Sequence, residues 1–193
     1  MSNINFEYNN IFIHVPKTAG SSMEEQPFVG GVAHQNAASL KSVAGALWYT
    51  MFTWGFVREP LGRFVSAFFH TPNITGYPQD NKGLIEFARL VADVGIDIAD
   101  AKKGIGPVHH HFIPQHYFLC ADDDEILVDY VGRYSYLPAH WNYVCNKIGV
   151  QPVELAHRRK SDYNYQYAEF YTNELVDILK TLYAKDYQIF GEF

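Results

Sequence analysis

Short runs of β-forming residues alternate with amphipathic segments along this chain. The apolar run 11–15 and the aromatic run 49–57 are typical of strands buried on both faces of a parallel sheet. The segment 125–132 predicts a third strand. Strands that alternate with helices indicate an α/β fold with a parallel sheet, and such sheets bind ligands beyond the carboxyl ends of their strands.

The helices are predicted from apolar spacing and from capping residues. Pro60 and Pro138 stand where first-turn prolines are expected, Gly149 where a helix ends, and Thr172 where the last helix begins. A further helix is expected over 36–48. Residues spaced for one buried helix face are Leu84, Phe87, Ala88 and Val91; Trp141, Val144, Cys145 and Ile148; and Leu175, Ile178, Leu179 and Leu182.

The segment "IFIHVPKTAGSS" (11–22) ends the first strand in a loop suited to an anion. Lys17 supplies a cation, Gly20 lets the backbone turn, and Ser21 and Ser22 offer hydroxyl and N–H groups where a helix could start. The alternative is an ordinary strand-to-helix turn with a capping serine. A strict Walker P-loop is excluded, because the lysine here precedes the glycine.

The second strand ends in "FVREPLGRFVSAFFH" (56–70), which has the residues of a phosphate clamp. Arg58 lies at the strand end, and Arg63 and Ser66 lie three apart on one helix face. The alternative is a surface arginine paired with Glu59, next to a helical serine bonded to its own backbone.

Composition narrows the class of protein. The length of 193 residues, without repeats or shifts in composition, fits one domain over 1–193. The net charge of −6 argues against a nucleic-acid partner. Cys120 and Cys145 form neither a disulfide framework nor a metal knuckle. Since the sequence has no signal peptide and no apolar run of about 18 residues, we expect a cytoplasmic protein without a membrane partner.

The two anion loops together, in this order, resemble the sulfotransferases that use 3′-phosphoadenosine 5′-phosphosulfate (PAPS), in particular the heparan sulfate 2-O- and chondroitin 4-O-sulfotransferase branch. "FIHVPKTAGSS" looks like that branch's 5′-phosphosulfate loop, and "FVREPLGRFVSAFFH" like its 3′-phosphate motif. The resemblance implies a P-loop-NTPase-like three-layer sandwich, with a central parallel sheet flanked by helices.

Later segments are similar to the same branch. "HFIPQHYFLC" (111–120) resembles its H-x-x-P-Q segment, and "VDYVGRYSYL" (128–137) a segment in which Ser135 replaces the usual Glu. Glu59 likewise replaces the usual Asp or Asn. "AHRRKSDY" (156–163) is similar to a basic loop that folds over the nucleotide.

The resemblance implies a role for each donor-site residue. Lys17 would neutralise charge on the oxygen between sulfate and 5′-phosphate. Arg58 and Ser66 would hold the 3′-phosphate, with Arg63 as a further candidate or as a structural residue. The remaining expected contacts to the donor come from Thr18, Ala19, Gly20, Ser21, Ser22, Arg159 and Lys160.

The acceptor is expected to be a small molecule or saccharide with a hydroxyl group. A general base is needed to take the proton of this hydroxyl as it attacks. His34 in "GGVAHQNAA" matches the base of the 2-O-sulfotransferases, followed by His111 and then His70. No metal is expected, because adjacent histidines such as His109, His110 and His111 point in alternating directions when the chain is extended. The alternatives are an ATP-dependent P-loop-like kinase and a non-catalytic fold-mate that binds nucleotide or saccharide.

Overall fold

The computed structural model describes residues 3–31, 33–103, 109–155, 170–191 and 193. They fall into two compact units. The sheet unit draws on 1–58, 115–158 and 193, and the helical unit on 59–114 and 159–192. The chain therefore leaves the sheet unit after Arg58 and returns to it at Gln115. The expectation of one domain stays a prediction.

The sheet unit contains four strands in the order β1 (Ile4–Asn5), β2 (Asn10–Ile13), β3 (Phe52–Val57) and β4 (Tyr130–Arg133). β3 pairs in parallel with β2 and β4, which confirms the three predicted strands and their direction. β1, which was not predicted, pairs antiparallel with β2, so the sheet is mixed at this edge while its three predicted strands are parallel. β2 is buried along its whole length, as its apolar run predicted.

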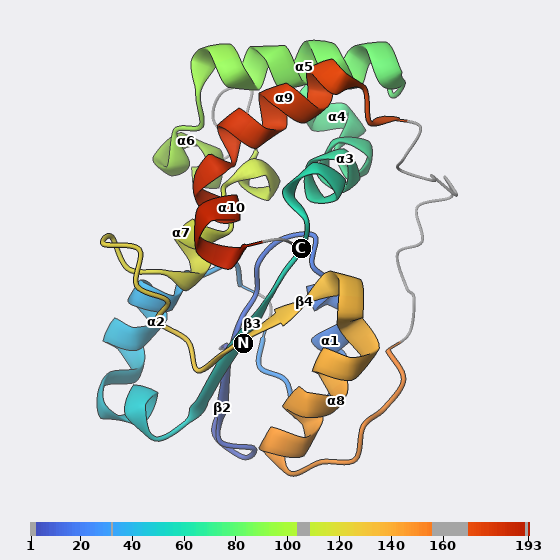
Figure 1. Ribbon diagram of the computed structural model, residues 1–193. Helices are drawn as coiled ribbons and strands as arrows, with labels where there is room; N and C mark the ends of the chain where they lie inside the picture. Colours follow the sequence, from blue (N-terminus) through green and yellow to red (C-terminus); the bar gives the residue numbers. More distant parts are fainter. Residues whose placement is uncertain (1–2, 32, 104–108, 156–169, 192) are drawn as a thin grey trace. The chain divides into compact units, whose positions relative to one another are not determined.

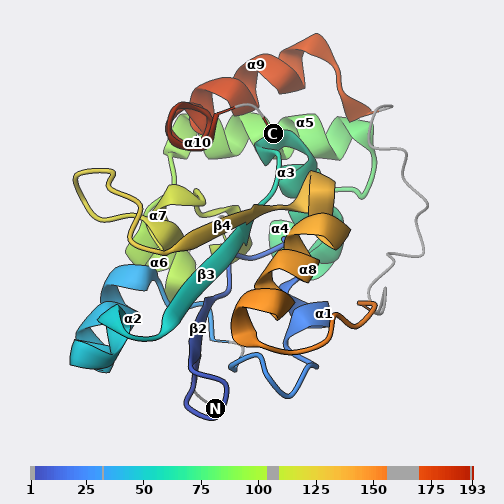
Figure 2. The same ribbon diagram turned by 60° about the horizontal axis from the view of Figure 1, so that its bottom comes forward.

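Helices flank this sheet on both faces (Figures 1 and 2). Trp54 and Phe56 of β3 pack against Trp141 of α8 (Leu137–Ile148). On the opposite face Gly55 lies against Leu119 of α7 (His116–Leu119). The sheet unit also contains α1 (Gly20–Met23), α2 (Ala37–Ala44), η1 (Gly45–Tyr49) and η3 (Tyr134–Tyr136). The arrangement is a mixed α/β fold with a central sheet.

β4 is shorter than the predicted strand 125–132. At Asp129, hydrogen bonds of side chains replace the backbone hydrogen bonds that would pair this residue with β3. The Asp129 carboxylate accepts hydrogen bonds from the backbone N–H and the hydroxyl of Thr53, at 2.8 and 2.9 Å. The Thr53 hydroxyl accepts one in return from the Asp129 N–H at 2.9 Å. Regular pairing with β3 therefore begins at Tyr130.

The helical unit is built around a cluster of aromatic side chains, among them Phe64, Phe68, Phe87 and Phe112. Its elements are α3 (Pro60–His70), α4 (Pro72–Thr75), α5 (Asn81–Val94), α6 (Ile98–Lys103), η2 (His110–Phe112), α9 (Asn173–Leu182) and α10 (Ala184–Phe190). Thr172 caps α9 as predicted. The prediction that this helix is the last is wrong, since α10 follows it after Tyr183.

Glu59 and Arg63 anchor the beginning of α3. Both Glu59 carboxylate oxygens accept backbone N–H groups of the first turn, and one also accepts the Tyr187 hydroxyl at 2.7 Å. Burial and this bond raise the pKa of Tyr187. The fully buried Arg63 guanidinium donates to the carbonyls of His111 and Ile113 at 2.9 and 2.8 Å. Arg63 therefore connects α3 to η2 and to the residue that follows it.

Replacing Arg63 tests this structural role. Arg63→Lys cannot reach both carbonyls in the same planar geometry, so we expect the free energy of unfolding to fall by about 2–3 kcal/mol. Arg89→Lys is the matched control, because Arg89 is exposed and pairs with Glu174 at the surface, where a change within about 0.5 kcal/mol is expected. Urea denaturation measures both variants. An Arg63→Lys protein as stable as the parent would exclude the anchoring role.

Candidate functional site

The loop after β2 has a backbone shape that the sequence does not reveal. Lys17 and Ala19 adopt left-handed conformations, with φ of 68° and 71°, on either side of the buried Thr18. The Thr18 hydroxyl donates to the Val15 carbonyl at 2.8 Å. Thr18 thus fixes the loop with its side chain. Its contact with the donor stays a prediction.

Gly20 has a different role from the predicted one. Its φ is not in the left-handed region; instead, a Cβ placed on Gly20 would lie 2.0 Å from Nε2 of His14. His14 is buried, stacks on Phe12, and has Nδ1 3.7 Å from a carboxylate oxygen of Glu24. Gly20 is therefore needed because the loop passes directly over an imidazole ring, and the turn itself is made by Lys17 and Ala19.

Arg58 follows β3 and reaches the same loop. Its Nη1 donates to the Lys17 carbonyl at 3.3 Å, and its guanidinium carbon lies 4.4 Å from the centre of the Tyr134 ring. Arg58 as a residue is only 8% exposed. β2 and β3 are neighbouring parallel strands, so the loop after β2 and Arg58 follow the carboxyl ends of adjacent strands. The sequence predicted that both follow strands of one sheet; that they bind a ligand stays a prediction.

His34 lies in the same unit as Lys17 and Arg58. Its Nδ1 is 3.0 Å from the His14 carbonyl, and its ring centre is 4.4 Å from that of His14. Since a carbonyl only accepts, Nδ1 carries a proton and the neutral ring has its lone pair on Nε2. Burial lowers the pKa of His34 below its ordinary value of 6.5, and the hydrogen bond opposes this by a smaller amount. Neutral His34 is therefore favoured near pH 7.

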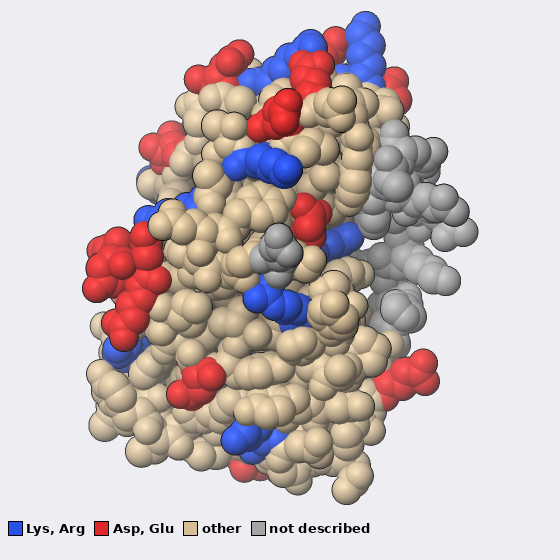
Figure 3. Space-filling model, viewed as in Figure 1, with Lys and Arg blue, Asp and Glu red and all other residues tan. Residues whose placement is uncertain are grey.

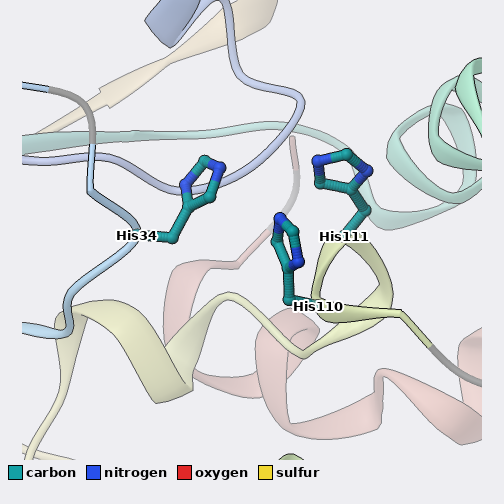
Figure 4. Close-up of side chains that lie close together, drawn as sticks. All are labelled: His34, His110 and His111. Carbon is teal, nitrogen blue, oxygen red and sulfur yellow. The ribbon is translucent and has the colours of Figure 1, made fainter. Parts of the chain in front are cut away.

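The other candidate histidines belong to the helical unit. His110 and His111 project from the same short turn, η2 (Figure 4). The ring centres of His109 and His110 are 3.8 Å apart, those of His110 and His111 4.4 Å apart, and that of His70 is 5.5 Å from His111. The expectation that adjacent rings point apart is wrong here, because residues 110–112 form a 3₁₀ turn and not an extended chain. The absence of a metal requirement stays a prediction.

The remaining predicted donor residues are distributed as follows. Ser66 lies half-buried on α3 in the helical unit, as does Arg63, whose guanidinium is engaged by backbone carbonyls. Ser21 and Ser22 lie on α1, and the Ser22 N–H donates to Ala19 within that turn. Arg159 and Lys160 lie outside the described residues. Ser135, at the position of the usual Glu, is exposed on η3.

Figure 3 shows lysine and arginine interspersed with aspartate and glutamate on the face it presents. Among the residues described, no helix has the length and apolar character needed to cross a bilayer.

Sequence reasoning missed three residues of this site: His14, Gln115 and Tyr134. His14 interrupts an otherwise apolar run, and a polar residue in a buried strand end is a usable signal. Gln115 was noticed only as part of a motif. Its side chain bonds to both the N–H and the C=O of Arg58, each at 2.8 Å. No local pattern could have paired residues this far apart in sequence.

The contact between Gly20 and His14 leads to a test by coupled substitution. Gly20→Ala places a methyl group against the imidazole, so we expect a loss of about 1–3 kcal/mol in the free energy of unfolding. In a His14→Ala background the same change should have a much smaller effect, since the two sites share this contact. Denaturation of the two single variants and the double variant measures the coupling. Equal effects in both backgrounds would disprove the steric role of His14.

Comparison with known proteins identifies the family of this chain. The profile described as "Sulfotransferase family" matches residues 2–192. No curated protein and no solved structure matches the chain significantly. The match begins ahead of β1 and ends after α10, and therefore covers both units. The chain belongs to the sulfotransferase family.

Proposed function

We propose that this protein transfers the sulfuryl group of PAPS to a hydroxyl group of a carbohydrate. Membership of the sulfotransferase family indicates sulfuryl transfer in general. The choice of PAPS rests on the two motifs, whose loops would take the 5′-phosphosulfate and the 3′-phosphate as in the P-loop-like sulfotransferases that they resemble. The choice of a saccharide acceptor rests on resemblance to the carbohydrate branch alone.

One observation carries the donor-site proposal: Arg58 donates to the Lys17 carbonyl at 3.3 Å. Lys17 and Arg58 follow adjacent parallel strands, so a ligand beyond the strand ends can contact both loops. Two separate cations bind a ligand with phosphate groups at two places more favourably than a ligand with one phosphate. PAPS is such a ligand.

The chain's own residues have distinct roles in this proposal. Lys17 neutralises the negative charge that develops at the leaving 5′-phosphate, and the segment 18–22 supplies backbone N–H groups to that phosphate. Arg58 holds the 3′-phosphate away from the reacting centre and so contributes binding energy and orientation. Ser66 is assigned to the 3′-phosphate on resemblance alone. Arg159 and Lys160 are proposed on resemblance alone. Arg63 is assigned the structural role, since its guanidinium serves two backbone carbonyls.

His34 is the proposed general base. Its Nδ1 donates to the His14 carbonyl, which orients the ring and puts the lone pair on Nε2, where it can accept the proton of the attacking hydroxyl. His34 lies in the sheet unit, as does Lys17. The proposal needs no metal ion, because Lys17 and Arg58 supply positive charge at the donor phosphates.

Substitutions in the two halves of the donor site should affect different properties, donor affinity in one case and kcat in the other. Arg58→Ala removes a charge-assisted contact remote from the sulfur, so we expect adenosine 3′,5′-bisphosphate to bind about 10- to 150-fold more weakly. Lys17→Ala should mainly lower kcat, since the charge it opposes grows in the transition state. Calorimetry and initial rates of sulfate transfer measure the two effects. Undiminished bisphosphate affinity in Arg58→Ala would refute the 3′-phosphate assignment, and an unchanged kcat in Lys17→Ala would refute the role of Lys17.

The base is tested by substitution and by pH. His34→Ala should lower kcat by about 10²- to 10⁴-fold while bisphosphate affinity stays nearly constant. Because the base must be neutral, the parent's rate should fall as the pH drops through the pKa of His34, which lies below 6.5. His111→Ala is the matched comparison. A fully active His34→Ala protein beside an inactive but folded His111→Ala protein would transfer the role to His111.

A further inference from the structure

Gln115 fixes the main chain of Arg58. Its side chain is fully buried, its Oε1 accepts the Arg58 N–H at 2.8 Å, and its Nε2 donates to the Arg58 C=O at 2.8 Å. A primary amide has one acceptor and one donor group side by side, so it reproduces the pairing that a neighbouring strand offers. Arg58 is the residue immediately after β3. Gln115 therefore prolongs the backbone order of this strand by one residue.

Tyr134 restricts the side chain of Arg58. The centre of its ring is 4.4 Å from the guanidinium carbon, a distance at which a cation interacts with the face of an aromatic ring. The position of Tyr134 is set by the sheet, since it follows Arg133, and Arg133 pairs with Val57 in the register of β3 and β4. Arg58 thus lies between the Tyr134 ring and the Lys17 carbonyl, in a site where only 8% of the residue is exposed.

We propose that Gln115 and Tyr134 are positioning residues for donor binding, and that both act through Arg58. This inference rests on the proposed function. A flexible arginine loses rotamer freedom when it binds an anion, which weakens binding, whereas an arginine already held in place loses little. The burial of Arg58 also strengthens its electrostatic attraction to a phosphate. Gln115 and Tyr134 therefore raise donor affinity without contacting the donor themselves.

Substitutions at Tyr134 give the first arm of the test. Tyr134→Leu removes the ring face and should weaken binding of adenosine 3′,5′-bisphosphate by about two- to thirtyfold in calorimetry. Tyr134→Phe keeps the ring and should bind nearly as the parent does. Tyr143→Leu is the matched control, because Tyr143 stacks on Tyr130 in the same unit and should leave the affinity unchanged.

Gln115 gives the second arm. Gln115→Glu keeps an acceptor for the Arg58 N–H but presents no donor to the Arg58 carbonyl when ionised, and Gln115→Met keeps the volume without either bond. We expect the affinity for adenosine 3′,5′-bisphosphate to fall in both variants. The larger loss, about tenfold, is expected in Gln115→Met. In sulfate transfer, KM for PAPS should rise while kcat at saturating PAPS changes little, since the contact lies away from the sulfur. The Tyr134 arm remains informative if a Gln115 variant does not fold.

A double-mutant cycle separates action through Arg58 from direct contact. In an Arg58→Ala background, Tyr134→Leu should cause no further loss of bisphosphate affinity. The same loss in both backgrounds, or folded Tyr134→Leu protein with the parent's affinity, would overturn the inference while leaving the proposed function intact. A parent protein that does not bind the bisphosphate would instead overturn the proposed function, and this inference with it.

Discussion

The pairing of the Gln115 amide with the main chain of Arg58 is the interaction on which the site depends. The chain leaves the sheet unit at Arg58, forms helices of the other unit, and returns at Gln115. Two hydrogen bonds at 2.8 Å join the points of departure and return. Because both groups are buried, loss of the amide would leave an unsatisfied N–H and C=O at the end of the central strand. The position of the proposed phosphate-binding arginine therefore depends on the contact between the residue where the chain leaves the sheet unit and the residue where it returns.

A second constraint operates beneath the loop after β2. The left-handed residues Lys17 and Ala19 bend the chain, and Gly20 lets it pass over the buried His14 ring. The His14 carbonyl in turn holds the His34 imidazole. One residue at the end of a strand therefore supports both the proposed phosphate loop and the proposed base. The proposed phosphate loop packs on the His14 side chain, and the proposed base bonds to the His14 backbone carbonyl.

Sequence predicted those features whose causes are local. Pro60 after Glu59, Gly149 and Thr172 marked helix ends correctly because capping depends on a few adjacent residues. Features with distant causes were missed or misjudged. β4 begins late because Asp129 bonds to Thr53 across the sheet, and Gly20 is required by the His14 ring and not by its own φ. The position of Arg58 at a strand end was predictable, but the partners that hold it were not.

The central claim is that the sheet unit holds a donor with phosphates at two places by means of charged side chains. The most direct measurement is calorimetric titration of the unmodified protein with adenosine 3′,5′-bisphosphate in the presence of EDTA, compared with adenosine 5′-monophosphate and, without EDTA, with ATP and Mg²⁺. We expect the bisphosphate to bind without metal and at least about tenfold more tightly than the monophosphate, because only the bisphosphate places a charge against Arg58. Equal affinity for the two nucleotides, or a preference for ATP with Mg²⁺, would contradict the account.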